Sequence, residues 1–195
     1  SYVSMFNNWF TTLNNTAGYI YVVRDPRDVA ISWSKHANLS YDDSISFMLN
    51  FNSCIEWAQT NSELPDSIKP KTFLSSWDEH VLSWTKNNLE VPKLILKYED
   101  LVYKKEEVIK IIVKFFEKNF KIEFNSIGEK IVNIVESTSF EKLKSQENEY
   151  GFAEASSGAF FRRGEKNQWK NELNVQQIAR LENKFRDFIN KFSYD

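Results

Sequence analysis

Cysteine and histidine are scarce in this sequence, and their scarcity argues against several kinds of site. Cys54 is the one cysteine among 195 residues, so the chain cannot form an internal disulfide bond and suits a reducing compartment. We therefore expect a cytoplasmic location. The two histidines, His36 and His80, belong to no C-x-x-C or H-E-x-x-H pattern, which argues against structural zinc and zinc-protease sites. We expect no bound metal.

Long apolar runs and an excess of one charge are also missing. No run approaches the roughly 20 apolar residues that span a bilayer, so we expect no membrane segment. With 25 basic and 27 acidic residues the formal net charge is −2, so we expect no nucleic-acid partner, and any basic site must be local. Ser1 is not an initiator methionine, and residues 1–13 lack the basic start of a signal peptide, so we expect further sequence upstream.

The sequence does contain enough apolar material for one folded domain. Hydrophobic residues make up 42% of the chain and aromatic residues 15%, which is typical of a globular protein. No internal repeat and no change in composition marks a linker. We therefore expect a single domain over residues 1–195.

Two short apolar runs predict the strands of the fold. Y-I-Y-V-V at residues 19–23 is a continuous apolar run of the kind found in parallel sheets, and K-L-I-L-K at 93–97 is the second strand. Asp25 can cap a helix that has Pro26 at its first position and extends to about Ala37. A strand, a capped turn, a helix and another strand predict an α/β fold, with a parallel sheet flanked by helices in three layers.

Helical spacing and capping patterns predict the other elements. Helices are expected at residues 43–59, from 77 onward, at 104–119, at 126–136 and from about 174 onward. Capping boxes are expected at 76–79 and 138–141. Residues 61–71 are predicted to be a loop and 146–171 a long irregular segment, which in a compact domain is usually functional or mobile. Ile45, Met48 and Phe51 (or Asn52) are expected at helical spacing in the first of these helices, and Ile111 and Val175 are expected to be buried.

A first candidate site follows the strand at residues 19–23. Arg24 stands at its carboxyl end, where open α/β sheets bind ligands. The next helix points its N-terminal amides and positive dipole end at the same place, and the Ser32 side chain leans toward it. These features together describe a phosphate pocket. The alternative is a structural arginine paired with Asp28 and a surface serine, and the spacing alone favours that alternative.

A second candidate is the sequence F-F-R-R-G at residues 160–164. Arg162 and Arg163 can clamp a phosphate in a bidentate manner, while backbone amides near Gly164 add contacts. The alternative is a solvated basic turn, which is the commoner fate of such a segment taken alone.

Two further places offer groups that suit a nucleotide base. Thr138 and Ser139 supply hydroxyls, and Phe140 supplies a ring that can stack on a base, although core packing is the commoner role of such a ring. Tyr98, at the end of the second strand, is open to the same two interpretations.

Four segments, taken in order, resemble the sulfotransferases that use 3′-phosphoadenosine 5′-phosphosulfate (PAPS). They are Y-V-V-R-D-P-R-D-V-A-I-S at residues 21–32, K-Y-E-D-L at 97–101, T-S-F-E at 138–141, and F-R-R-G with W-K at 161–170. The Arg–Ser spacing and the R-R-G…W-K block are specific, whereas K-Y-E-D-L alone is not. The resemblance implies a P-loop nucleotide-hydrolase-like fold and transfer of a sulfuryl group from PAPS to a hydroxyl or amine of a small-molecule acceptor.

The resemblance also implies a role for each candidate residue. Arg24 and Ser32 would bind the 3′-phosphate of PAPS or of its product, adenosine 3′,5′-bisphosphate (PAP), and the R-R-G segment would close over the same group. The hydroxyl and aromatic residues would border the adenosine. The implied cofactor-binding residues are Arg24, Ser32, Tyr98, Thr138, Ser139, Phe140, Phe161, Arg162, Arg163 and Gly164.

Other family features are not found in this sequence. The lysine-bearing phosphosulfate loop and the histidine base of the family lie upstream of residues 19–23, and neither His36 nor His80 matches the position of the base. We expect the fold to lack its first strand and that loop, no catalytic residue to be present, and the chain alone to be inactive and marginally stable. A core or surface role is expected for both histidines.

Three points stay open at this stage. A P-loop kinase-like transferase and a non-catalytic nucleotide-binding protein are the alternative functions. The dimer segment of the family, K-x₃-T-V-x₃-E, is matched at Lys170 and Val175 but has Asn174 and Ala179 in place of the threonine and the glutamate. Homodimer formation is therefore in doubt, and the acceptor is not defined.

Overall fold

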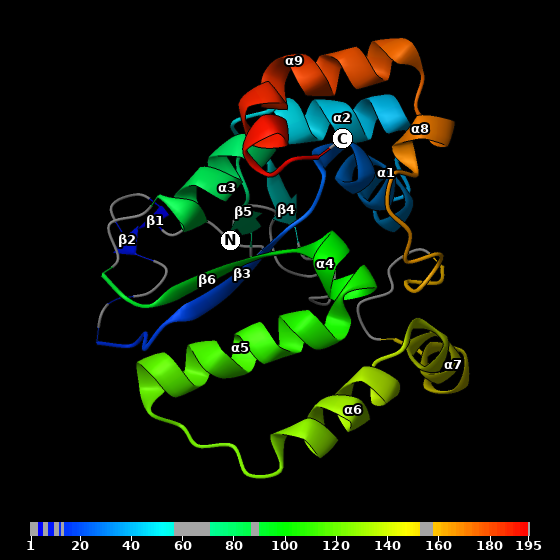
Figure 1. The fold of residues 1–195 in the computed structure, drawn as a ribbon. Helices are drawn as coiled ribbons and strands as arrows, with labels where there is room; N and C mark the ends of the chain where they lie inside the picture. Colours follow the sequence, from blue (N-terminus) through cyan, green and yellow to red (C-terminus); the bar gives the residue numbers. More distant parts are fainter. Residues whose placement is uncertain are drawn as a thin grey trace, which may run out of the picture.

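The computed structural model describes residues 4–5, 8–9, 12, 14–56, 71–86, 90–152 and 158–194 (Figure 1). The strands are β1 (Ser4–Met5), β2 (Asn8–Trp9), β3 (Tyr19–Val23), β4 (Cys54–Glu56), β5 (Lys71–Phe73) and β6 (Lys93–Lys97). The helices are α1 (Pro26–His36), α2 (Tyr41–Leu49), α3 (Trp77–Thr85), α4 (Tyr98–Tyr103), α5 (Lys105–Phe120), α6 (Ile127–Ser137), α7 (Phe140–Tyr150), α8 (Trp169–Glu172) and α9 (Val175–Lys191).

β3 and β6 form the parallel pair that positions the site. Their register pairs Tyr19 with Lys93 and Val23 with Lys97, so both strands end at the same edge. Both have the bounds predicted from their apolar runs. Within the described residues the parallel sheet consists of these two strands, while β1–β2 and β4–β5 are separate antiparallel pairs.

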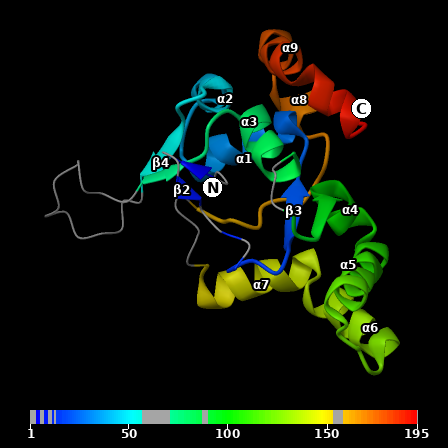
Figure 2. The same ribbon diagram turned by 90° about the vertical axis from the view of Figure 1, so that its left-hand side faces the viewer.

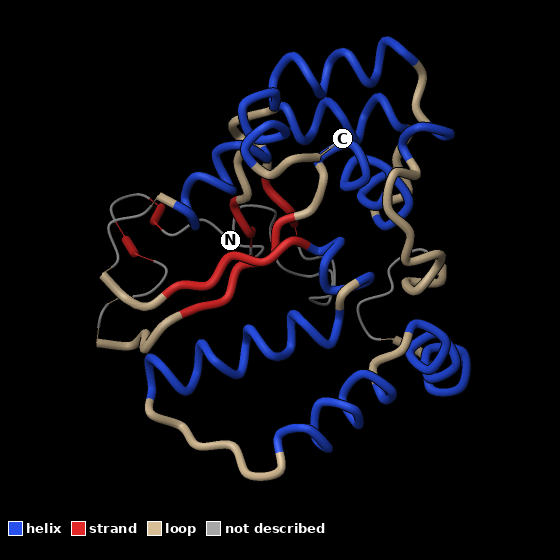
Figure 3. The backbone as a smooth tube through the Cα atoms, in the orientation of Figure 1, coloured by secondary structure: helices blue, strands red, loops and turns tan. Residues whose placement is uncertain are grey.

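Helices cover both sides of β3 and β6 (Figures 1 and 3). α5 runs along one side with α6 beyond it, whereas α1, α2, α3 and α9 lie on the other side. Figure 2 shows α7 and α9 on opposite sides of β3. The predicted α/β class is therefore confirmed, with a small parallel sheet and many helices. No helix in the described part of the chain is both long and apolar enough to cross a membrane.

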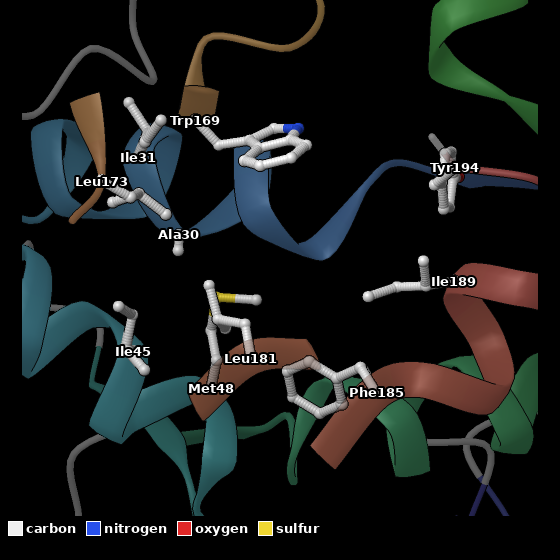
Figure 4. Close-up of a cluster of buried hydrophobic side chains, with 10 residues drawn as sticks. All are labelled: Ala30, Ile31, Ile45, Met48, Trp169, Leu173, Leu181, Phe185, Ile189 and Tyr194. Atoms are coloured by element: carbon white, nitrogen blue, oxygen red, sulfur yellow. The ribbon is translucent and has the colours of Figure 1, made fainter. Parts of the chain in front are cut away.

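A cluster of buried apolar side chains lies between α1, α2 and α9 (Figure 4). α9 places Leu181, Phe185 and Ile189 on one helical face, and the first two are fully buried. Ala30 is also fully buried, and its carbonyl accepts a hydrogen bond of 2.6 Å from the Ser44 hydroxyl, so small residues let α1 and α2 pack closely. This packing fixes α1, which carries part of the site.

The helix expected at residues 43–59 is shorter than predicted. α2 begins at Tyr41 after a Ser40 cap and ends at Leu49. The Ser53 hydroxyl then donates to the Phe47 carbonyl, which closes a turn that leads into β4. Phe51 and Asn52 lie in that turn, so the helical position predicted for Phe51 (or Asn52) is wrong, and the Phe51 side chain is 57% exposed. The predicted loop at 61–71 falls almost entirely outside the described residues.

The predicted capping boxes at α3 and α7 are wrong in detail. The Ser76 hydroxyl donates to the Asp78 carboxylate and caps no backbone amide. α7 is capped by Ser139 instead of Thr138, and it continues to Tyr150, inside the segment predicted to be irregular.

Two side chains predicted to be buried are exposed for identifiable reasons. Ile111 is 47% exposed because α5 packs inward through Val108 and Ile109, both of which are buried. Val175 is 82% exposed and is the first residue of α9, one turn before the buried face begins. The start of α9 itself is as predicted, with a full capping box between Asn174 and Gln177.

Candidate functional site

A cavity of about 580 Å³ opens beside the carboxyl ends of β3 and β6. Arg24 reaches it from the end of β3, Ser32 from α1 and Tyr98 from the start of α4, directly after β6. Because parallel strands end at one edge of their sheet, residues distant in sequence meet there. Of the ten predicted binding residues, all except Ser139 line this cavity: Arg24, Ser32, Tyr98, Thr138, Phe140, Phe161, Arg162, Arg163 and Gly164.

Arg24 is held by contacts that leave part of its guanidinium available. The guanidinium carbon lies 4.4 Å from the centre of the Tyr98 ring, and Nη2 donates to the Glu165 carbonyl at 3.3 Å. Nε is buried and has no hydrogen-bond partner among the described residues. No ion pair between Arg24 and Asp28 is found in this part of the chain, so the structure does not support the alternative of a structural pair. A buried donor without an acceptor beside a cavity suits an anion.

The N-terminus of α1 is closed by its own cap. The Asp25 carboxylate accepts from the backbone N–H of Arg27 at 2.9 Å and also bonds the Arg27 guanidinium. That guanidinium is buried, bonds Glu182 and lies 3.9 Å from the Trp169 ring. Burial lowers the pKa of Arg27, but the two carboxylates outweigh this effect and raise it. The Arg27 amide is therefore not available to a ligand, contrary to the prediction that the first amides of this helix face the phosphate.

Asp28 connects α1 to the segment that follows the R-R-G sequence. Its carboxylate accepts from the backbone N–H groups of Asn167 at 2.7 Å and Trp169 at 3.1 Å. Burial raises the pKa of Asp28, and these two hydrogen bonds act in the opposite direction. Residues 160–168, which include the R-R-G sequence, form the basic loop. Asp28 thus anchors one end of this loop, a role that the sequence did not reveal.

Gly164 lies directly on the Phe140 ring. Its φ is +65°, and a Cβ built there would lie 2.6 Å from Phe140 Cδ2, so only glycine fits both the backbone conformation and the space. The Phe161 ring meets the Phe140 ring edge-on, with 6.4 Å between centroids. Phe140 therefore supports the basic loop and lines the cavity at the same time.

The two loop arginines have different surroundings. Burial lowers the pKa of Arg162, the negative charge of Glu172 raises it, and the positive charge of Arg24 lowers it further. No carboxylate pairs with Arg162 among the described residues. Arg163, in contrast, is 60% exposed and forms an ion pair of 3.2 Å with Glu172, which also accepts a hydrogen bond from the Tyr41 hydroxyl. The cavity therefore has two unpaired arginines and a third that is shared with a carboxylate.

The hydroxyls of Ser32, Thr138 and Ser139 differ in whether they are available to a ligand. Ser32 is half-buried on the cavity wall, and its hydroxyl makes no hydrogen bond within the described residues. The Thr138 hydroxyl donates to the Ile134 carbonyl, and the Ser139 hydroxyl caps α7 by accepting from Lys142. Ser32 is thus free to donate to an anion, whereas Ser139 serves the helix and lies outside the cavity wall.

Comparison with known proteins assigns the family. Residues 8–193 match the family described as the sulfotransferase domain. The chain belongs to the sulfotransferase domain family. It is 29% identical to the amine sulfotransferase of Oryctolagus cuniculus, over 93% of this chain and 59% of that protein. It is 32% identical to cytosolic sulfotransferase 11 of Arabidopsis thaliana, over 80% of this chain and 43% of that protein.

Two solved structures share the fold. The crystal structure of mouse sulfotransferase SULT7A1 complexed with PAP superposes with a TM-score of 0.59 at 23% identity, covering 86% of this chain and 57% of that one. Retinol dehydratase gives a TM-score of 0.58 at 22% identity, covering 87% and 46%. The architecture is therefore the sulfotransferase fold, and the chain spans about half the length of these four proteins, from 43% to 59%.

The two histidines have different positions in this sulfotransferase domain. His80 is half-buried, with Nδ1 2.9 Å from the Tyr21 hydroxyl, and burial lowers its pKa to about 4. His36 lies on the cavity wall, and its ring centroid is 5.6 Å from that of Trp33 and 6.4 Å from that of Phe160. Its position at the end of α1, one turn after Ser32, is the signal that could have located it. Within the described residues no cluster of metal-ligating side chains is present.

Proposed function

We propose that the cavity binds a nucleotide with a 3′-phosphate, and that the complete protein transfers a sulfuryl group from PAPS to a small-molecule acceptor. One observation carries the proposal. Arg24, Ser32 and Arg162 line one cavity, and among the described residues no carboxylate forms an ion pair with either arginine or a hydrogen bond with the serine. Membership of the sulfotransferase domain family supports the same chemistry.

The donor set fits a phosphate dianion. Two guanidinium groups supply bidentate, charge-assisted hydrogen bonds, and a serine hydroxyl adds a neutral donor. Positive charge concentrated in a partly buried cavity attracts an anion more strongly than the same charge on an open surface. Arg163 is placed to contribute a third guanidinium by exchanging Glu172 for the phosphate.

The aromatic residues fit the rest of the nucleotide. Tyr98 and Phe140 line the cavity from α4 and α7, and Thr138 lies next to Phe140. Aromatic faces in a pocket bind a purine by stacking, a contact worth about 1–3 kcal/mol per base. Tyr98 is covered by Arg24 and Phe140 by Gly164, so each ring offers its other face to the adenine.

The acceptor and the location belong to the same proposal. The rabbit relative is named for amines and the Arabidopsis relatives as cytosolic enzymes, which supports an amine or hydroxyl acceptor and a cytoplasmic location. A P-loop nucleotide-hydrolase-like sheet is the fold expected to hold PAPS in this way.

Calorimetric titration of the chain with PAP and with adenosine 5′-phosphate tests the 3′-phosphate assignment. We expect PAP to bind at least about tenfold more tightly, because the two arginines contact only the extra phosphate. Arg24→Ala should remove most of this difference. Arg186→Ala, on the surface of α9, is the matched control and should leave it unchanged. Equal affinity for the two nucleotides would defeat the assignment.

Sulfuryl transfer needs its own measurement. Incubation of the complete protein with PAPS and a set of phenols and amines should yield a sulfated product. Tight PAP binding without any product would favour the alternative, a nucleotide-binding protein without catalytic activity.

A further inference from the structure

Glu147 is a buried acid that the proposed function does not use. It lies near the end of α7 and is 9% exposed. Its carboxylate has no ion-pair partner among the described residues. Instead, Oε1 accepts from the backbone N–H of Phe160, and Oε2 accepts from the backbone N–H of Phe161 at 2.8 Å. One carboxylate therefore binds two consecutive amides directly before Arg162.

This contact fixes the backbone from which Arg162 extends. Two hydrogen bonds to consecutive N–H groups define the orientation of the peptide planes on either side of Phe160. Both bonds are charge-assisted, so they are shorter and stronger than bonds between neutral groups. Burying a carboxylate without such partners is unfavourable, so packing alone does not explain an acid at this position.

Aromatic rings surround the same contact. The Phe160 ring lies 4.7 Å from the Phe152 ring, and the Phe161 ring lies 5.4 Å from it, measured between centroids. Phe160 and Phe161 also contact each other at 5.2 Å. Apolar surroundings strengthen a hydrogen bond to a charged acceptor.

The basic loop is thereby anchored at both ends by carboxylates. Glu147 holds it before Arg162, and Asp28 holds it at Asn167 and Trp169, after Gly164. The two acids belong to α7 and α1, and both of these helices contribute residues to the cavity wall. Without Glu147, the loop would be held by a carboxylate on one side only.

We propose that Glu147 is a positioning residue, which holds the basic loop so that Arg162 faces the 3′-phosphate of the nucleotide. This inference rests on the proposed function, because it assumes that the cavity binds a 3′-phosphate. It predicts that Glu147 affects how strongly the protein prefers nucleotides with that phosphate over nucleotides without it. The effect is indirect, because the Glu147 side chain bonds the loop backbone.

The test uses Glu147→Gln in the full chain. Glutamine keeps the size and one acceptor oxygen, but its NH₂ group faces a backbone N–H that it cannot accept from. We expect the affinity for PAP to fall about tenfold, while the affinity for adenosine 5′-phosphate changes less than about twofold. Glu149→Gln, an exposed change of the same charge on the same helix, should alter neither affinity.

Amide hydrogen exchange provides an independent measurement. In the wild-type protein the Phe160 and Phe161 amides should be protected, and protection should increase when PAP binds. Glu147→Gln should reduce that protection. If the variant does not fold, the wild-type exchange still decides, because unprotected Phe160 and Phe161 amides overturn the proposal.

The outcomes separate this inference from the proposed function. If Glu147→Gln keeps the wild-type ratio between the affinities for PAP and adenosine 5′-phosphate, the proposed role of Glu147 is wrong. An equal loss of affinity for both nucleotides overturns it as well. Failure of the wild-type protein to distinguish the two nucleotides overturns the proposed function instead, whatever the exchange of the two amides shows.

Discussion

Replacement of Gly164 by alanine tests whether the basic loop rests on Phe140. A left-handed backbone costs an alanine about 1 kcal/mol or slightly more, and Gly164 has a φ of +65°. The added Cβ would lie 2.6 Å from the Phe140 ring, and such overpacking costs roughly 1–3 kcal/mol. We expect Gly164→Ala to lower the free energy of unfolding by about 2–4 kcal/mol and to weaken PAP binding.

Two other glycines separate these contributions in urea unfolding followed by tryptophan fluorescence. Gly151 has a φ of +75° and a ψ of 174°, a conformation essentially restricted to glycine, but it has open space within 4 Å, so Gly151→Ala should show a backbone cost of roughly 1–3 kcal/mol and no steric cost. Gly128 lies in α6 with open space and no positive φ, so Gly128→Ala should stabilise the protein by up to about 1 kcal/mol. All three variants should keep the wild-type m-value.

The double variant Gly164→Ala with Phe140→Ala tests whether the Phe140 ring causes the steric part of the cost. Without the ring, the new methyl group has room, and the cost of Gly164→Ala should fall to the backbone cost of about 1 kcal/mol or slightly more. An equal cost in both backgrounds would refute the contact.

Three further predictions concern other parts of the chain. Burial lowers the pKa of His80 from 6.5 to about 4, so on acidification the unfolded chain takes up the proton before the folded chain does. The free energy of unfolding should therefore fall as the pH drops from 6.5 toward 4, by up to about 3 kcal/mol. Unfolding curves at several pH values should show this decrease, and His80→Phe should remove it. Arg162→Ala should weaken PAP binding more than Arg163→Ala in calorimetric titrations, because Arg163 is 60% exposed and paired with Glu172; the reverse order would contradict this assignment. Phe185→Ala should cost roughly 3–5 kcal/mol in urea unfolding because the ring is fully buried, and a loss below about 1 kcal/mol would show that the core is placed wrongly.

Local patterns were sufficient to predict the elements that place the site. Continuous apolar runs located β3 and β6, and the rule for parallel strands then placed Arg24 and Tyr98 at one edge. The Asp25–Pro26 pair likewise predicted the start of α1. These features depend on neighbours in sequence or on one general property of sheets, so no knowledge of the tertiary contacts was needed.

Features that depend on distant partners were not predictable. Asp28 bonds an amide 139 residues away, and Glu147 bonds amides 13 and 14 residues away. The pairing of Arg163 with Glu172 also depends on how the loop returns to α8. At Phe51 the helical spacing continued, but the hydrogen bond from Ser53 to the Phe47 carbonyl favoured a turn.

The pairing of β3 with β6 has a consequence for the order of events in folding. Asp25 and Glu99, which follow the two strands, are 74 residues apart and are joined by a hydrogen bond of 3.0 Å. Contacts with such a large sequence separation require closure of a long loop, and they form slowly compared with local helices. Arg24 and Tyr98 therefore meet only when this closure is complete. During synthesis, the arginine would leave the ribosome well before the partner ring that orients it, so the anion site should appear in one late step together with the sheet.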